Sequence, residues 1–261
     1  MKNISIAIIN NKGGVGKTTC TAGIATALSE KKYKILLIDT DPQGNLSRLF
    51  GFEPKDNRDK SLSLCLDNKF RDGKNTSLDY IEHTENGLID ILVGDLNLTS
   101  NRIDVERAFM RFDFIYKHII DEIKKADRYD FIIFDTCPSL GAENSQILMA
   151  VDNLIIPSTS GRNSVEGIDQ LIDFYNNCKN VNSSLRLLGI LFNNVNLNSV
   201  IGKDIIPMVK DAYGDYIFDT VVIRSVVAEK IEWGGLKPGN NKIYDAFVNA
   251  TEEVLSRLGE K

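Results

Sequence analysis

The chain has 261 residues, of which 43% are hydrophobic and 26% are charged, so it can bury a large core as one domain over residues 1–261. Its formal net charge of −5 argues against a uniformly basic nucleic-acid-binding protein, although a local basic patch stays compatible with it. The four cysteines, which lie far apart without a CxxC pair, argue against a disulfide framework or a zinc site and fit a reducing cytoplasm.

The first part of the chain predicts alternating strands and helices. Residues 4–9 form a short apolar run before a glycine-rich turn, as in a buried parallel strand, and leave no room for a signal peptide. Residues 17–30 carry a helical apolar stripe, and residues 34–39 read as the next strand. Because such crossovers are right-handed, this unit predicts a parallel sheet. The polar stretch 51–86 has weak periodicity and predicts an irregular surface segment.

The rest of the chain continues the alternation. Residues 88–93 read as a strand, and residues 103–125 carry apolar residues at helical spacing, so we expect one long helix there. Further strands are predicted at 131–135, 153–157, 185–193 and 217–223, and further helices at 143–150, 165–178, 201–212 and 242–258. The order predicts an α/β fold with a doubly wound, mostly parallel sheet and helices on both faces. No apolar run approaches membrane-spanning length, and we expect a cytoplasmic protein.

Residues 11–19 read Asn-Lys-Gly-Gly-Val-Gly-Lys-Thr-Thr and lie between a predicted strand and a predicted helix. Small residues let consecutive backbone N–H groups close around phosphate oxygens at a helix N-terminus. A P-loop also needs a lysine for the β- and γ-phosphates and a hydroxyl for Mg²⁺, which predicts these roles for Lys17 and Thr18. The remaining predicted nucleotide contacts are Lys12, Gly13, Gly14, Val15, Gly16 and Thr19. The strict GxxxxGK[ST] pattern fails at Asn11, where its first glycine would stand, and Lys12 adds a second cation.

Carboxylates follow two of the predicted strands. Asp41 lies in a loop just past the strand 34–39, where a carboxylate can orient an attacking water near the γ-phosphate and help to hold the metal. Asp135 ends the strand 131–135, where a carboxylate binds Mg²⁺ through its water shell. Strand-end carboxylates in ordinary turns are the alternative for both, and the P-loop upstream favours function. Asp39 is the weaker candidate of the pair Asp39 and Asp41.

The run from Lys12 to Thr19 resembles the deviant Walker A motif of the ParA/MinD/Soj group of ATPases. The likeness extends to Asp39-Thr-Asp-Pro-Gln-Gly-Asn45, Asp135-Thr-Cys-Pro-Ser139 and Ile223-Arg224, and is strongest to short ParA ATPases without an N-terminal helix-turn-helix. It implies ATP hydrolysis with Mg²⁺ in a sandwich homodimer. In that group the early lysine, here Lys12, reaches the partner's nucleotide, and the resemblance assigns Asp41 to water orientation. Relatives commonly have two prolines where this chain has Cys137-Pro138.

The resemblance also suggests contacts with the base and with DNA. Asn193, at a strand end, matches an asparagine that binds adenine in relatives, with an ordinary strand-end asparagine as the alternative. Arg224 lies in a segment that resembles the one closing over the base, but follows Ile223 where many relatives have proline. The basic residues of the last quarter could gather as a DNA surface, with Arg224 the best candidate, or form a solvated mixed-sign surface: Lys203, Lys210, Arg224, Lys230, Lys237 and Lys242.

The function that the resemblance implies is partition of DNA. The ATP-bound homodimer would bind DNA without sequence preference, associate with the nucleoid, and be released when a ParB-like centromere-binding partner stimulates hydrolysis. A MinD-like membrane regulator is the first alternative, but the C-terminal tail with Val254, Leu255 and Leu258 on one side carries three Glu against one Arg and one Lys. A cargo-positioning ATPase would use identical chemistry. An iron–sulfur reductase would need two cysteines at a dimer axis, where Cys137 is the candidate.

Overall fold

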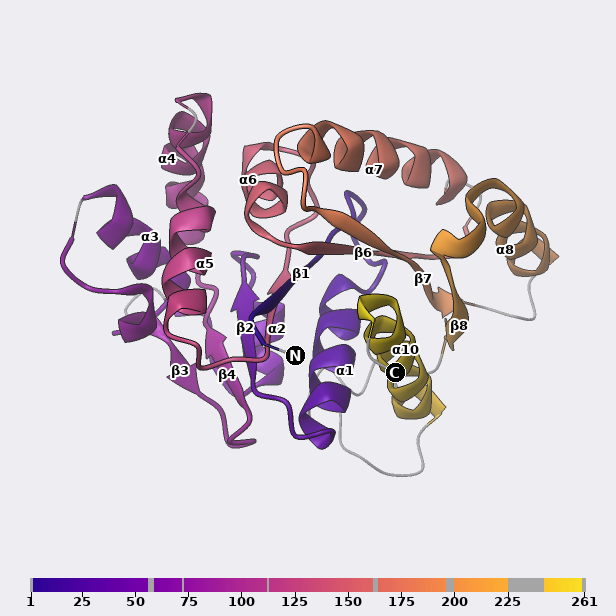
Figure 1. The fold of residues 1–261 in the computed structure, drawn as a ribbon, viewed down its shortest axis with the longest axis horizontal. Helices are drawn as coiled ribbons and strands as arrows, with labels where there is room; N and C mark the ends of the chain where they lie inside the picture. The colour runs from indigo at the N-terminus through magenta and orange to yellow at the C-terminus, as the bar shows by residue number, and fades with distance from the viewer. Residues whose placement is uncertain are drawn as a thin grey trace.

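A sheet of parallel strands lies at the centre of the molecule (Figure 1). The computed structural model describes residues 2–55, 59–71, 73–111, 113–161, 164–195, 200–224 and 242–259. Within these residues the strand order is β3-β4-β2-β5-β1-β6-β7-β8, and every neighbouring pair is parallel except β3 with β4. The strands are β1 Ile4–Ile8, β2 Ile35–Asp39, β3 Glu82–His83, β4 Ile89–Leu92, β5 Phe131–Asp135, β6 Asn153–Ser158, β7 Arg186–Val195 and β8 Ile217–Ile223. The predicted fold class is confirmed.

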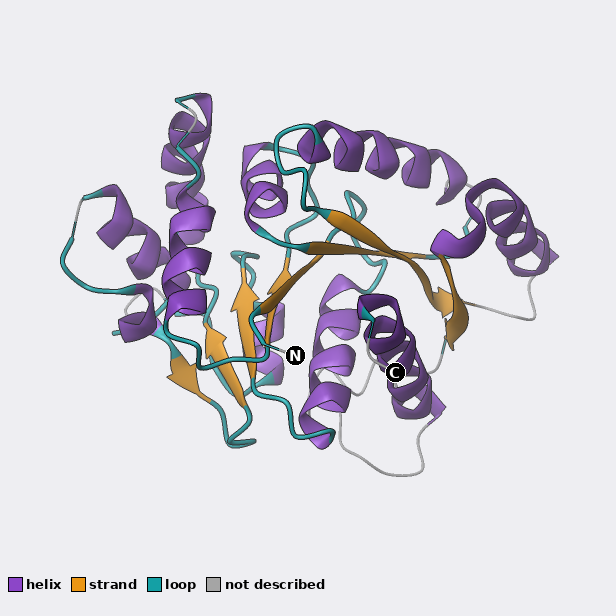
Figure 2. Ribbon diagram, in the orientation of Figure 1, coloured by secondary structure: helices purple, strands orange, loops and turns teal. Residues whose placement is uncertain are grey.

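Helices cover both faces of the sheet (Figure 2). One face packs against α1 (Lys17–Glu30), α2 (Asn45–Leu49) and α10 (Lys242–Leu258). The other packs against α3 (Leu62–Phe70), α4 (Leu98–Met110), α5 (Ile115–Lys125), α6 (Ala142–Ala150), α7 (Ser164–Lys179) and α8 (Val200–Tyr213). Successive strand side chains point to opposite faces, so Ile6 and Ile8 enter the first layer while Ala7 enters the second. This is why the central strands are mostly apolar on both of their faces.

Two predicted segments were wrong. The stretch 51–86 contains α3, the 3₁₀ turn Ser77–Tyr80 and β3. The helix α3 forms because Leu62, Cys65 and Leu66 share one buried face and because the Ser61 hydroxyl accepts from the amide of Leu64 as an N-cap. The predicted helix 103–125 is two helices, α4 and α5, separated by residues 111–114. Tertiary packing positions this break, which hydrophobic spacing alone does not reveal.

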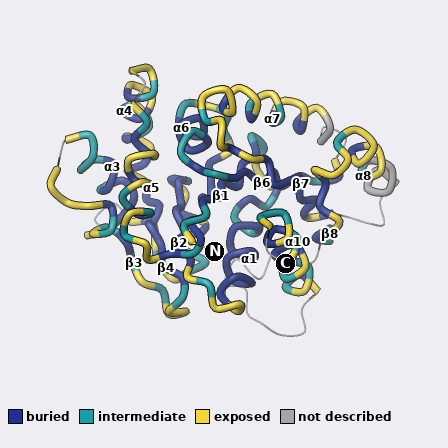
Figure 3. Tube along the Cα trace, viewed as in Figure 1, coloured by how far each residue is buried: buried dark blue, intermediate teal, exposed yellow. Residues whose placement is uncertain are grey.

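The C-terminal helix α10 lies beside α1 (Figures 1 and 3). Val254 and Leu255 are buried there, and the ring of Phe247 occupies the space that a side chain on Gly23 of α1 would need. The apolar side of the C-terminal tail, which membrane binding would require to be exposed, therefore packs in the core. Among the described residues, no helix combines the length and the apolar character needed to cross a bilayer.

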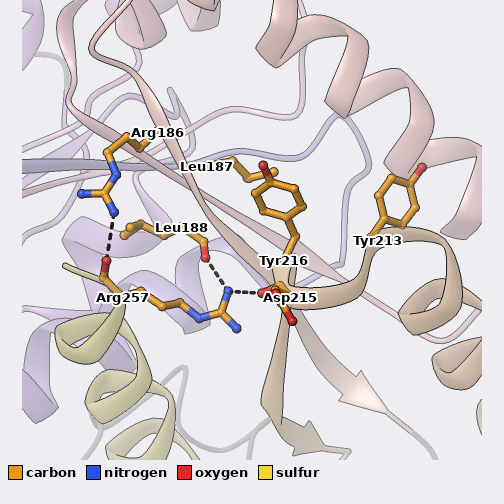
Figure 4. A pocket seen from close by; sticks show the side chains of 7 residues that line it. All are labelled: Arg186, Leu187, Leu188, Tyr213, Asp215, Tyr216 and Arg257. Atoms are coloured by element: carbon orange, nitrogen blue, oxygen red, sulfur yellow. Dashed lines mark hydrogen bonds between the residues drawn. The ribbon is translucent and has the colours of Figure 1, made fainter. Parts of the chain in front are cut away.

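Arg257 joins α10 to the start of the neighbouring strands (Figure 4). Its guanidinium donates to the carbonyl oxygens of Leu188 at 2.7 Å, Asp215 at 2.9 Å and Ile217 at 2.8 Å, and lies 4.4 Å from the centroid of the Phe218 ring. These contacts line a groove of about 460 Å³ at the amino end of β7. Because three of the five N–H donors of this guanidinium are used on protein carbonyls, the groove is a structural junction between α10 and the sheet.

Candidate nucleotide-binding site

Three loops with the predicted site residues meet at the carboxyl edge of the sheet. They follow β1, β5 and β2, which are adjacent and in register, with Ile8 opposite Asp135 and Asp135 opposite Asp39. Because parallel strands end at the same edge, the P-loop, the Asp41 loop and the Asp135 loop lie side by side. Crevices of this kind outside the carboxyl ends of strands are where ligands bind in α/β folds.

Glycine backbone shapes the P-loop. Gly14 has φ of 73° and Gly16, the N-cap of α1, has φ of 82°, a left-handed conformation that other residues rarely adopt. A side chain at position 16 would also overlap the amide of Asn193. The Asn193 side chain donates to the carbonyl oxygen of Val15 at 3.0 Å, so β7 ends against the P-loop. The structure thus places Asn193 beside the P-loop, and its contact with adenine stays a prediction.

The two loop lysines are held differently. Lys17 is buried and its Nζ donates to the Lys12 carbonyl oxygen at 3.1 Å. Burial lowers the pKa of Lys17, while the negative charges of Asp135 and Asp41 act in the opposite direction. The Lys12 amide donates to Asn10 Oδ1 at 2.9 Å. The buried Asn10 in turn donates to the Pro157 carbonyl at 2.7 Å, which fixes the loop to β6.

Asp135 faces the start of α1. Its Oδ2 accepts from the Thr18 hydroxyl at 2.7 Å, and its Oδ1 accepts from Thr21 at 3.3 Å. Burial, followed by the charge of Asp39, raises the pKa of the Asp135 carboxyl to about 8. Carboxylate and hydroxyl oxygens are the ligands that Mg²⁺ prefers, and a divalent cation would relieve the repulsion that raises this pKa. The donor set therefore fits magnesium, which Thr18 would bind directly and Asp135 through water.

The two aspartates at the end of β2 differ in their surroundings. Asp39 is fully buried, and its carboxylate accepts from the backbone and hydroxyl of Ser47 and from the Asp41 amide, at 2.7–3.1 Å. It therefore fixes the start of α2 and the loop, and burial raises its pKa to about 6. Asp41 is half-buried, and its charge acts on Lys17 and Asp135. Position thus favours Asp41 for the water and assigns Asp39 to structure.

A buried acidic residue beside the Asp135 loop was not predicted from the sequence. Glu143 of α6 accepts from Tyr116 Oη at 2.9 Å, from Arg102 Nε at 3.2 Å and from Cys137 Sγ at 3.5 Å. This cluster ties α4 and α5 to the loop after Asp135. The spacing of these residues along the chain gives no signal of it, because they come from separate elements.

The Cys137 thiol is poorly suited to an iron–sulfur cluster. It is buried, and burial together with the charge of Glu143 raises its pKa to about 12, which disfavours the thiolate that metal binding needs. No group of three or more His, Cys, Asp or Glu side chains is arranged to hold a metal within the described ranges. The structure therefore offers the iron–sulfur alternative no support.

The predicted basic surface is seen only in part. Arg224 is exposed at the end of β8, and its amide donates to the Val195 carbonyl at 2.8 Å. Lys210 is ion-paired with Asp219 at 2.9 Å, and Lys242 lines a groove together with four carboxylates: Asp219, Asp245, Glu252 and Glu253. The side chain of Lys203, and both Lys230 and Lys237, lie outside what the structure describes. Lys210 and Lys242 thus lie among acidic residues.

The raised pKa of Asp135 predicts a measurable effect of removing its charge. A carboxyl whose folded pKa is about 8, against an ordinary 3.8, stabilises the fold below about pH 4 and loses that contribution as the pH rises through 8. Without nucleotide and magnesium, Asp135→Asn should therefore raise the free energy of unfolding relative to the wild type, and by more at about pH 8.5 than at about pH 5. Urea unfolding at about pH 5 and pH 8.5 measures this, and a variant that is less stable at the higher pH would contradict it.

Comparisons with known proteins agree with this geometry. Residues 3–187 match the AAA_31 family, described as an AAA domain. An uncharacterized protein of Methanocaldococcus jannaschii is 33% identical over 98% of this chain and 99% of its own length. The sporulation initiation inhibitor protein Soj of Bacillus subtilis is 30% identical over 85% of this chain and 84% of its own length.

A similar solved structure is cobyrinic acid a,c-diamide synthase from Mycobacterium smegmatis with a bound ATP analog and magnesium. It is 25% identical, has a TM-score of 0.82, and is matched over 98% of this chain and 95% of its own. The matched family, the Soj relative and the three loops at one sheet edge lead to one conclusion: the chain belongs to the ParA/Soj family of deviant Walker A ATPases.

Proposed function

We propose that the protein is a Mg²⁺-dependent ATPase that works as a dimer switch in a DNA partition system, with the ATPase domain spanning residues 1–261. The observation that carries this proposal is the meeting of Lys17, the Thr18–Asp135 pair and Asp41 at one edge of the sheet. Hydrolysis of a nucleoside triphosphate needs a cation at the phosphates, a magnesium site and a carboxylate that orients water, arranged in this way. ATP analog and magnesium in the similar solved structure support the same ligands here.

Each residue of the site takes one task in this proposal. The backbone amides of Gly13 to Thr19 bind phosphate oxygens at the start of α1, and Lys17 neutralises the β- and γ-phosphates. Thr18 directly and Asp135 through water would hold magnesium, which would supply charge neutralisation at these phosphates. Asp41 orients water for attack on the γ-phosphate.

The remaining contacts complete the nucleotide site. Lys12 of one subunit approaches the nucleotide of its partner, so that hydrolysis depends on pairing. Asn193 and Arg224 contribute to the side where the base would lie. Asn193 of β7 donates to the Val15 carbonyl of the P-loop, and Arg224 follows the neighbouring strand β8, where its amide donates to the Val195 carbonyl.

The proposed role in DNA partition depends on pairing of the subunits that requires ATP. In the proposal, the ATP-bound homodimer binds DNA without sequence preference and associates with the nucleoid, and a ParB-like centromere-binding partner stimulates hydrolysis and release. The names of two other matches, a chromosome partitioning protein and a plasmid partition protein, support this assignment. The described lysines Lys210 and Lys242 do not support it, because they lie among carboxylates. Arg224 therefore carries the DNA part of the proposal.

The test is retention of the protein on DNA of unrelated sequence with ATP, with ADP and without nucleotide. We expect retention only with ATP, and a loss of about tenfold or more in Arg224→Ala. Arg186→Ala, at the opposite end of the neighbouring strand β7, is the matched control and should be retained like the wild type. Equal retention in all three nucleotide states would remove the partition mechanism while leaving the ATPase assignment in place.

A further inference from the structure

The helix α7 contacts the first two residues of the P-loop. Gly167 and Gln170 are three positions apart, so they lie on one face of this helix. The Asn11 side chain donates from Nδ2 to Gln170 Oε1 at 3.1 Å. Asn11 stands where the strict P-loop pattern has glycine, and a glycine could not make this bond. The departure from the pattern therefore gives the loop a side-chain anchor on α7.

The side chain of Lys12 lies over the same face of α7. A Cβ atom added at Gly167 would lie 2.7 Å from Lys12 Nζ and 3.1 Å from Lys12 Cε, closer than ordinary contact allows. Only glycine leaves room for the end of the lysine there. A glycine inside a helix costs about 1 kcal/mol relative to alanine, so its presence in α7 calls for a packing reason. Contact with Lys12 supplies that reason.

Separate contacts fix the backbone at Lys12 and the direction of its side chain. Asn10, anchored on the Pro157 carbonyl of β6, accepts from the Lys12 amide, and Lys17 donates to the Lys12 carbonyl. With the backbone held on both sides, the side chain can change place by rotation about its own bonds without rebuilding the loop.

We propose that Gly167 and Gln170 form a cradle that holds Asn11 and Lys12 in the unpaired subunit, and that Lys12 leaves it when two subunits close over ATP. The cradle follows from the contacts in one chain, whereas the release step rests on the proposed dimer switch. Gly167 and Gln170 act as positioning residues: they set the fraction of subunits whose lysine is ready to cross. Weakening the cradle should therefore favour pairing.

The cradle is tested first without nucleotide, by the rate of reductive methylation of the Lys12 amine read by peptide mass spectrometry. The exposed Lys125 serves as the internal reference. Gly167→Ala places a methyl group where the amine rests, so the rate at Lys12 should rise about threefold or more. Gln170→Ala should raise it less, by about twofold, because it removes the anchor of the neighbouring Asn11. Gln170→Glu keeps an acceptor for Asn11 and should leave the rate at or below that of the wild type.

Unchanged labelling in both Gly167→Ala and Gln170→Ala would overturn the cradle. Asn177→Ala truncates an exposed amide further along α7 and should match the wild type. If Asn177→Ala raised the rate as much as Gln170→Ala, general loosening of α7 would explain the effect and the cradle would also fall.

The release step is tested by sedimentation with Mg-ATP over a range of protein concentrations. Gly167→Ala should lower the concentration at which half the protein is paired by about threefold to tenfold, the effect of losing one modest contact. The same substitution in a Lys12→Ala background should have no such effect. Loss of pairing in Gly167→Ala would show that the glycine serves the closed dimer, and would overturn the release step. Absence of pairing in the wild type would instead refute the proposed dimer switch, with the labelling result still deciding the cradle.

Discussion

Lys12→Ala should weaken ATP-dependent pairing by a hundredfold or more. A closed homodimer would contain two Lys12–phosphate contacts, one from each subunit, and hydrogen bonds to charged groups contribute about 1.5–3 kcal/mol each. Losing both costs roughly 3–6 kcal/mol, which is a factor of a hundred to ten thousand in the pairing constant. Sedimentation with ATP and a non-hydrolysable analog measures the change, and ATP turnover at fixed protein concentration should fall with it.

Two further variants distinguish loss of the Lys12 charge from a general loss of a lysine or of folding. Lys74→Ala removes an exposed lysine between α3 and the 3₁₀ turn, away from the three loops, and should pair like the wild type. Lys12→Gln keeps a hydrogen-bond donor without the charge and should be nearly as defective as alanine, because the phosphates demand the cation. Nucleotide binding to the single subunit should persist in all three variants. Pairing of Lys12→Ala at wild-type concentrations would contradict the cross-subunit lysine.

Asp41→Asn should slow ATP hydrolysis by about a hundredfold or more while ATP binding and pairing are retained. General acid–base groups contribute about 10²- to 10⁴-fold, and asparagine keeps the size of the side chain and an oxygen that can accept from the Gln43 amide. The ATP-bound dimer should therefore accumulate. Single-turnover hydrolysis measures the chemical step, and sedimentation with ATP measures the trapped pair.

The control for this charge removal is Asp127→Asn. Asp127 is exposed in the turn between α5 and β5, at the edge of the sheet opposite the P-loop, and has φ of 50°, which asparagine tolerates. Its turnover should equal that of the wild type. Hydrolysis by Asp41→Asn within a few-fold of wild type would exclude Asp41 as the water-orienting carboxylate, and Asp39 could not replace it because its oxygens bind Ser47 and the Asp41 amide.

The central strands could be predicted from sequence because they are buried on both faces. The runs at 4–9, 34–39 and 131–135 are mostly apolar and lead into polar turns, and the structure has strands there. Their carboxyl ends carry the P-loop, Asp41 and Asp135, so a parallel sheet alone implies that these loops meet. The outer elements were harder. The helix α3 and the break between α4 and α5 depend on burial against other helices, which local periodicity underestimates.

The sequence by itself determined the family and the fold class, because apolar strand runs alternate with helices and the glycine-rich run at 11–19 lies between a strand and a helix. Tertiary structure alone decided which groups near the site are structural. It placed Asp39 on Ser47, the tail helix in the core, Glu143 among three donors, and Gly167 beneath Lys12. These contacts join residues far apart in the chain, and their energies come from burial and geometry that no local pattern encodes.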